Sequence, residues 1–163
     1  MTGTVGATAV VTLPTSASIL VTRAFAAPPQ QVYRAVTVPG LLRRWCSGGT
    51  DEVRVAEVDL RVGGRWRTVI VGDGYTVGSH GVFHELVPGA RIVRTEVDEG
   101  APDAEAHAAL CTYTFTGTAD GSTVSLLTML RSWEDRDALL DSGLAEGVTA
   151  IWELWEQVAR SAA

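Results

Sequence analysis

The chain has 163 residues, of which 46% are hydrophobic and 20% charged, a size and composition typical of one globular domain with a sizeable core. Its 19 acidic and 13 basic side chains give a net charge of −6, which excludes nucleic acid as an expected partner because phosphates attract positive surfaces. The two cysteines lie outside any metal-ligand spacing and are too few for a disulfide framework. We therefore expect a reduced, cytoplasmic protein that binds no metal and no cofactor.

The first 17 residues mix Thr, Ala, Val and Gly without a basic start. The apolar run at residues 9–11 is too short for the core of a signal peptide or for a membrane span. We predict that residues 1–17 form a flexible N-terminal extension, with one added edge strand around residues 10–13. A single domain is then expected to occupy residues 18–163.

A strand followed by two small helices opens the expected domain. Residues 19–25 are rich in β-branched side chains of mixed polarity, which is typical of a strand. Pro28 stands where a helix would begin, because proline at the first helical position loses no needed hydrogen bond. Pro39 is predicted to close that helix and to open a second short one over residues 41–45.

From residue 53 to residue 131 the pattern indicates an antiparallel meander. Segments rich in Val, Ile, Thr and aromatic residues alternate with turn signals such as Gly63-Gly64 and Asp120-Gly121. The segments lie at 53–59, 65–71, 77–87, 90–97, 109–117 and 123–131. With the first strand they predict about seven antiparallel strands, and a sheet of that size twists and curls around a concave face.

The last part of the chain is predicted to form one long helix across that concave face. Ser132 and Asp135 have the spacing of a capping box, and the acidic residues of the first turn suit the positive end of the helix dipole. Gly143 and Gly147 each cost about 1 kcal/mol in a helix interior relative to alanine, which indicates close backbone approach, a bend or open space. The apolar stripe at the helical period comprises Leu140, Leu144, Gly147, Val148, Ile151, Leu154, Trp155 and Val158.

The segment at residues 59–66, Asp-Leu-Arg-Val-Gly-Gly-Arg-Trp, is the best identifier in the chain. The other residues of the pattern are Arg23-Ala24-Phe25, Ala27-Pro28, the stretch from Val32 to Val36, Pro39, Trp45, Gly81-Val82-Phe83, Glu85 to Pro88 and Arg91-Ile92-Val93. In this order and spacing the set resembles the START-like, or SRPBCC, superfamily, and within it the activator of Hsp90 ATPase homologue 1-like family. The resemblance covers roughly residues 18–160. It implies an α+β helix-grip fold, in which a seven-stranded antiparallel sheet wraps around a long C-terminal helix and two short helices separate the first two strands.

Similar proteins hold a ligand between the long helix and the sheet, so the resemblance implies that this chain binds a small hydrophobic, aromatic or amphipathic molecule. The five tryptophans favour such a site, because each offers a large apolar body with one N–H donor. Taken singly, each aromatic side chain is more typical of a plain core position. The expected lining comprises Trp45, Trp66, Thr68, Phe83, Glu85, Tyr113, Leu144, Gly147 and Ile151.

Sequence motifs for several kinds of active site are missing. The hydrolase elbow Gly-x-Ser-x-Gly, the phosphate-binding loop and the metal-binding helix His-Glu-x-x-His are all absent. His80 and His84 share a strand face but would lie roughly 13 Å apart, which is too far for both to bind one metal ion. We therefore favour passive binding over catalysis.

Glu85 is the candidate acid–base residue, and two interpretations stay open for it. Strict alternation with Phe83 and Val87 would aim its carboxylate into the apolar cavity, where its pKa would rise. In the other interpretation the opposite face of the strand points inward, and Glu85 is solvated or paired with Arg91 or Arg94.

Two further functions are compatible with the resemblance. Related SRPBCC members include polyketide cyclases and aromatases, in which Glu85 with His84 or Tyr113 would transfer protons. The activator family stimulates a chaperone ATPase, but this chain leaves no room for the additional N-terminal domain of the full activator, so we do not expect a chaperone partner. Pairing of two copies as a homodimer stays open.

Overall fold

The computed structural model describes residues 7–162 of the chain, and the part of the expected flexible extension at residues 1–6 lies outside the described residues. The strands are β1 (Val10–Thr12), β2 (Ser18–Phe25), β3 (Glu52–Val58), β4 (Arg65–Gly72), β5 (Tyr75–Val87), β6 (Arg91–Asp98), β7 (Ala109–Thr118) and β8 (Gly121–Met129). The helices are α1 (Pro29–Thr37), α2 (Pro39–Leu42), the short 3₁₀ helix η1 (Ala104–His107), α3 (Trp133–Asp141) and α4 (Leu144–Ser161).

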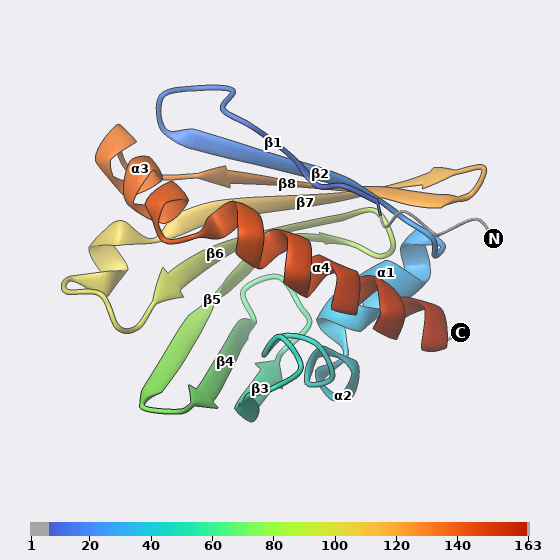
Figure 1. Ribbon diagram of the computed structural model, residues 1–163, viewed down its shortest axis with the longest axis horizontal. Helices are drawn as coiled ribbons and strands as arrows, with labels where there is room; N and C mark the ends of the chain where they lie inside the picture. The colour runs from blue at the N-terminus through green and yellow to red at the C-terminus, as the bar shows by residue number, and fades with distance from the viewer. Residues whose placement is uncertain (1–6, 163) are drawn as a thin grey trace.

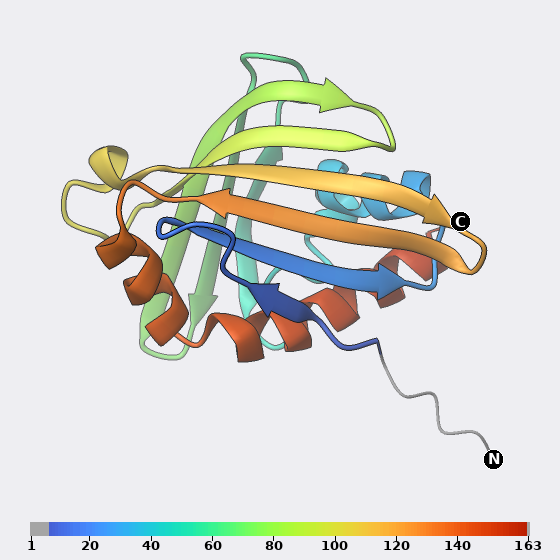
Figure 2. The same ribbon diagram turned by 90° about the horizontal axis from the view of Figure 1, so that it is seen from above.

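The strands form one antiparallel sheet in the order β1-β2-β8-β7-β6-β5-β4-β3. The sheet curves, and α4 lies along its concave side with α1 and α2 near one end (Figure 1 and Figure 2). This arrangement confirms the α+β helix-grip prediction. The described sheet has eight strands rather than seven, because the expected added edge strand forms as β1 and pairs with β2.

The two short helices form near their predicted prolines, although α1 begins at Pro29 and α2 covers Pro39–Leu42 rather than residues 41–45. Pro28 is the extended N-cap residue of α1, which begins at Pro29, and Pro39 is the first residue of α2. The buried face of α1 includes Val32, and this helix packs closely against α4. Trp45 follows α2, and its Nε1 donates a hydrogen bond to a main-chain carbonyl of α1 at 2.9 Å. The pair of helices therefore closes one end of the concave face.

The predicted long C-terminal helix across the sheet is confirmed as α4, but its predicted start at Ser132 is wrong, because the chain breaks between α3 and α4. Gly143 has a φ of 90°, in the left-handed region that L side chains rarely adopt, and the helical hydrogen-bond pattern restarts after it. Only α4 lies across the sheet, whereas α3 lies beside β2 (Figure 1). The predicted cap is confirmed at Ser132, whose hydroxyl accepts a hydrogen bond from the Asp135 N–H at 3.2 Å.

The hydrophobic core fills the space where α1, α4 and the sheet meet. Trp155 is 1% exposed and packs edge-on against Phe25 and Trp152, with ring centroids 5.0 and 5.3 Å away. Its Nε1 donates a hydrogen bond to the Val32 carbonyl at 3.0 Å. The apolar residues of α4 gather on one side, and within residues 7–162 no helix combines the length and the hydrophobicity needed to cross a bilayer.

Candidate functional site

Side chains alternate between the two faces of a strand, so each central strand has one row of side chains on the face toward α4. In β7 this row includes Cys111 and Tyr113, both buried in the core. In β6 it comprises Ile92, Arg94 and Glu96, and the register places Ile92 beside Tyr113 and Arg94 beside Cys111. An arginine and a glutamate therefore project into a mostly apolar interior, which also contains the buried Arg23 of β2 paired with Glu156 of α4.

Arg94, Glu96 and Tyr113 form a hydrogen-bonded cluster on the concave face, which we call the polar cluster. Nε and Nη2 of Arg94 both donate to Oε2 of Glu96 at 3.3 Å, and the Tyr113 hydroxyl donates to the same oxygen at 3.2 Å. Arg94 Nη2 also donates to the Tyr113 hydroxyl at 3.3 Å. The arginine and glutamate side chains are 11% and 31% exposed, so the pair is largely removed from water while part of the glutamate stays accessible.

Aromatic rings flank the guanidinium of Arg94. Its Cζ lies 3.9 Å from the ring centroid of Trp66 and 5.2 Å from that of Tyr113, within the range of cation–π attraction. Trp66 reaches across β5 and donates its Nε1–H to the Thr95 carbonyl at 3.1 Å. This crossing requires glycine at position 81, because a Cβ on Gly81 would lie 1.8 Å from the Thr95 oxygen and 2.7 Å from Trp66 Nε1. Gly81 therefore leaves the room that Trp66 needs to cross β5 and stack on Arg94.

The pKa values of Tyr113 and Arg94 are both raised in the polar cluster. Burial raises the pKa of Tyr113, and the Glu96 carboxylate raises it further. Burial opposes the charged form of Arg94, but the neighbouring Tyr113 and Glu96 outweigh that cost and raise the pKa of the guanidinium. At neutral pH Tyr113 is therefore a neutral phenol and Arg94 a cation, and both groups suit hydrogen bonding to a bound molecule better than proton exchange with it.

α4 presents two rows of residues toward the interior. One row is buried in the core and comprises Val148, Trp152, Trp155 and Ala159. The other, which we call the half-buried row, comprises Leu144, Gly147, Ile151 and Leu154. A Cβ added at Gly147 would meet no atom within 4 Å, so open space lies beside this row. On β4, Thr68 and Ile70 are also only half-buried, although alternation places them on the same face as the buried Trp66.

The predicted lining residues lie on both sides of the junction between α4 and the concave face. Trp66, Phe83 and Tyr113 of the sheet are buried in the same core as Trp45, which stacks on Trp155 with centroids 5.0 Å apart and an interplanar angle of 4°. Thr68 of β4 and Leu144, Gly147 and Ile151 of the half-buried row are only partly buried. Two hollows among the described residues lie elsewhere, one on the outer face of the sheet and one beside η1.

The inward placement of Glu85 is wrong. A bulge in β5 between Phe83 and Glu85 shifts the pairing with β6, so strict alternation fails at this point. Glu85 is exposed, and its carboxylate accepts a hydrogen bond from Arg91 Nε at 3.2 Å, which confirms the alternative of a pair with Arg91. The inward turn of the opposite face is not confirmed at this point, because Phe83 is buried in the core. His84 is exposed as well. An acid–base role inside the domain therefore loses the residue on which it depended.

Arg94 and Glu96 are the members of the site that the sequence prediction missed. The available signal was the alternation of Ile92, Arg94 and Glu96 along one strand face. On a solvent-facing strand the same spacing would produce an ordinary surface ion pair. The two cases differ only in what covers the face, and that depends on elements far away in the sequence.

A second charged group lines a hollow of about 560 Å³ on the outer face of the sheet. His80 bridges Glu99 and Glu105 through its two ring nitrogens, at 2.7 and 2.6 Å, and Arg67 donates to both oxygens of Glu99 at 2.9 and 3.0 Å. Hydrogen bonds from Arg67 and His80 hold the pKa of Glu99 down at about 2, and contacts with Glu99 and Glu105 raise the pKa of His80. Because these groups satisfy one another, we assign them to fastening the β6–β7 connection onto the sheet.

Replacing Glu99 with glutamine is expected to lower the free energy of unfolding at pH 7 by on the order of 1 kcal/mol, a modest value because Arg67 is half exposed. The folded-state pKa of Glu99, about 2, lies below its ordinary value of 4.5, so its contribution is full above pH 4.5 and is lost as the pH falls toward 2. Urea unfolding at pH 7 and near pH 2 measures the difference. Glu52→Gln, which breaks an exposed pair with Arg54, is the control and should have little effect; a deficit of Glu99→Gln that persists near pH 2 would contradict this assignment.

Known proteins are similar to this chain over most of its length. Residues 26–159 match the family described as "Activator of Hsp90 ATPase homolog 1-like protein". A solved protein from Rhodobacter sphaeroides has a TM-score of 0.84 and 21% identity, with 94% of this chain and 99% of that chain covered. A protein from Chromobacterium violaceum has a TM-score of 0.73 and 27% identity, covering 88% and 98%, and one from Mycobacterium smegmatis has 0.78 and 20%, covering 91% and 96%. No curated protein matches the chain.

Proposed function

The chain belongs to the activator of Hsp90 ATPase homologue 1-like family, and we propose that it binds a small hydrophobic or amphipathic molecule between α4 and the concave face of the sheet. The observation that carries this proposal is the polar cluster, which is set between aromatic rings and lies on the face that α4 covers. Open space beside Gly147 supports it. A cytoplasmic setting is included, because both Cys46 and Cys111 are free thiols.

A buried ion pair contributes little net stability to a protein, because the cost of removing two charges from water offsets their attraction. Sites for small molecules, in contrast, combine a mostly apolar lining with a few fixed polar groups that orient the ligand. Arg94, Glu96 and Tyr113 supply the polar groups, while the half-buried row and Ile70 supply apolar surface that is not fully covered. We therefore expect the apolar body of the ligand to lie along α4 with its polar end toward Glu96.

Binding is favoured over catalysis within this proposal. General acid–base groups work best when their pKa lies near the working pH. The pKa values of Tyr113 and Arg94 are both raised away from neutrality, so these two groups hold their protons. Glu85, the candidate acid for a cyclase-like reaction, lies on the surface in a pair with Arg91.

Filling the space beside Gly147 tests the proposal directly. Gly147→Leu adds four carbon atoms where an added Cβ meets no neighbour, so the fold should tolerate it while the site loses volume. We expect the affinity for the neutral fluorescent probe N-phenyl-1-naphthylamine, measured by fluorescence titration, to fall at least about tenfold, which corresponds to about 1.4 kcal/mol.

The matched control is Ala145→Leu, which adds bulk to the same helix at an exposed position. Two positions along a helix differ by about 200° in direction, so this side chain lies on the opposite side from residue 147. The control should bind the probe like the wild-type protein. If Gly147→Leu keeps its circular dichroism spectrum and binds the probe with unchanged affinity, the ligand site does not lie beside α4.

A further inference from the structure

We infer that the ligand of this site carries a neutral hydroxyl group, which donates a hydrogen bond to Oε1 of Glu96. The inference rests on the proposed function, because it names the chemistry of a molecule bound at the same place. It follows from how the hydrogen bonds of the polar cluster are distributed between the two oxygens of one carboxylate.

All hydrogen bonds that the structure gives the Glu96 side chain end on Oε2. Arg94 donates to that oxygen from Nε and Nη2, both at 3.3 Å, and Tyr113 donates to it from its hydroxyl at 3.2 Å. Within residues 7–162, Oε1 of Glu96 accepts no hydrogen bond from a nitrogen or hydroxyl donor, and no fully buried side-chain oxygen lacks a partner. Oε1 must therefore face accessible space, in agreement with the 31% exposure of this side chain. The buried Cys111 thiol lies beside the same carboxylate, and burial together with that carboxylate raises the pKa of the thiol.

The position of Oε1 makes it the natural acceptor for a ligand. Glu96 lies in the inward-facing row of β6 that contains Ile92 and Arg94, so its accessible part is on the side of the sheet that α4 covers. An ionised carboxylate offers about four acceptor positions, two on each oxygen, and the three donors to Glu96 all converge on Oε2, so the acceptor positions of Oε1 are not used by them. A hydrogen bond to a charged acceptor is also roughly twice as strong as one between neutral groups.

The charges around Oε1 select a neutral donor. An anionic ligand group would meet the negative carboxylate of Glu96 at hydrogen-bond distance, which like-charge repulsion disfavours. An ammonium group would lie close to the guanidinium of Arg94, which is only 3.3 Å from the same carboxylate and is shielded from water. A phenol or an alcohol avoids both conflicts and still donates a hydrogen bond.

Three probes of nearly equal size separate these possibilities in calorimetric titrations of the full chain at neutral pH. 2-Naphthol carries the donor, 2-methoxynaphthalene has the same ring and oxygen without the donor, and 2-naphthoate is the anion. We expect 2-naphthol to bind about tenfold more tightly than 2-methoxynaphthalene, since a hydrogen bond to a charged group is worth about a factor of ten or more. 2-Naphthoate should bind no more tightly than the methoxy compound.

Two variants assign the preference to the Glu96 carboxylate. The control Glu52→Gln removes an exposed carboxylate outside the polar cluster, so it should retain the preference for 2-naphthol. The double variant Arg94→Met with Glu96→Met removes the acceptor without leaving one unpaired buried charge, and it should bind 2-naphthol and 2-methoxynaphthalene equally. If the double variant does not fold, the three-probe comparison on the wild-type protein decides alone.

Equal affinities of the wild-type protein for 2-naphthol and 2-methoxynaphthalene would overturn the inference and leave the proposed function standing. Tightest binding of 2-naphthoate would overturn it too, and would identify Arg94 as the anchor. Absence of binding for all three probes, together with absence of binding for N-phenyl-1-naphthylamine, would instead contradict the proposed function itself.

Discussion

Replacing Trp155 with alanine is expected to lower the free energy of unfolding by about 4 kcal/mol. This value is within the range measured for large aromatic side chains in protein cores. Trp155 is 1% exposed, stacks on Trp45 and packs edge-on against Phe25 and Trp152. The substitution also removes the hydrogen bond to the Val32 carbonyl. Because this residue joins α1, α4 and the sheet, urea unfolding should show the loss as one cooperative shift of the midpoint.

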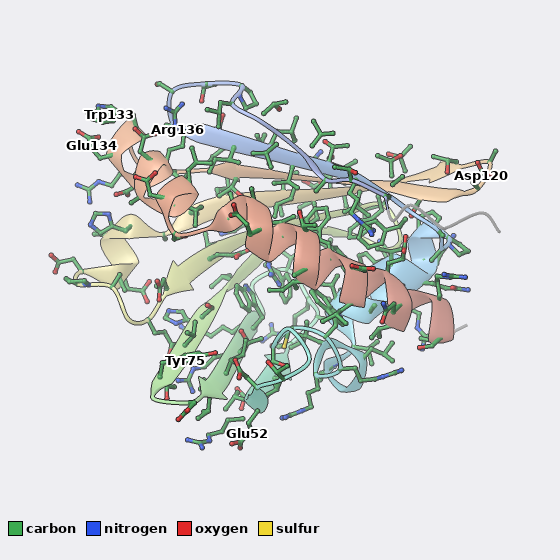
Figure 3. The ribbon with its side chains drawn as sticks, in the orientation of Figure 1. Glu52, Tyr75, Asp120, Trp133, Glu134 and Arg136 are labelled. Atoms are coloured by element: carbon green, nitrogen blue, oxygen red, sulfur yellow. The ribbon has the colours of Figure 1, made fainter. Side chains whose placement is uncertain are left out.

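The matched control is Trp133→Ala, which removes the same side chain from the surface. Trp133 is 57% exposed at the start of α3, where it lies at the outer end of the helix (Figure 3). Surface substitutions of this kind usually change stability by no more than about 0.5 kcal/mol. A loss at Trp133 as large as that at Trp155 would show that the core extends to α3, contrary to the burial described here.

Local signals determined most of the fold. The strand segments around Thr68 and Tyr113 follow from alternation between turn residues, and the first two helices begin next to Pro28 and at Pro39, close to where the prolines predicted them. The helix period continued through Gly143, so it predicted a single helix, but the left-handed φ of that glycine separates α3 from α4. The hydrophobic periodicity depends only on which positions are apolar. It therefore gives no sign of a single residue, such as Gly143, at which the chain changes direction.

The site was predicted in part, and the errors have one physical cause. Trp66 and Tyr113 lie on the concave face because their strands are regular, whereas Glu85 moves to the surface because a bulge precedes it. Arg94 and Glu96 were missed because charged residues are normally placed outside. Arg94 and Glu96 instead contact Trp66 and Tyr113, which lie on other strands, so their placement depends on residues that are distant along the chain.

A double-mutant cycle on Arg94 and Glu96 should show a large electrostatic effect. Glu96→Met leaves the guanidinium of Arg94, which is 11% exposed, without its carboxylate partner. Removing one member of a buried pair costs about 3 to 5 kcal/mol, and we expect about 3 kcal/mol here because Glu96 is partly accessible and Tyr113 still contacts the arginine. Urea unfolding at pH 7 measures the cost.

Adding Arg94→Met to Glu96→Met should restore most of that stability, to within about 1 kcal/mol of the wild-type protein, because two methionines replace the desolvated charges with apolar contacts. Met at position 94 would also keep a favourable sulfur contact with the ring of Trp66. Recovery in the double variant would mean that the protein retains the pair for a purpose other than stability, as a ligand site requires. If the double variant were instead as unstable as the sum of the single changes, the pair would be a structural element of the fold and its value to a ligand would lose this support.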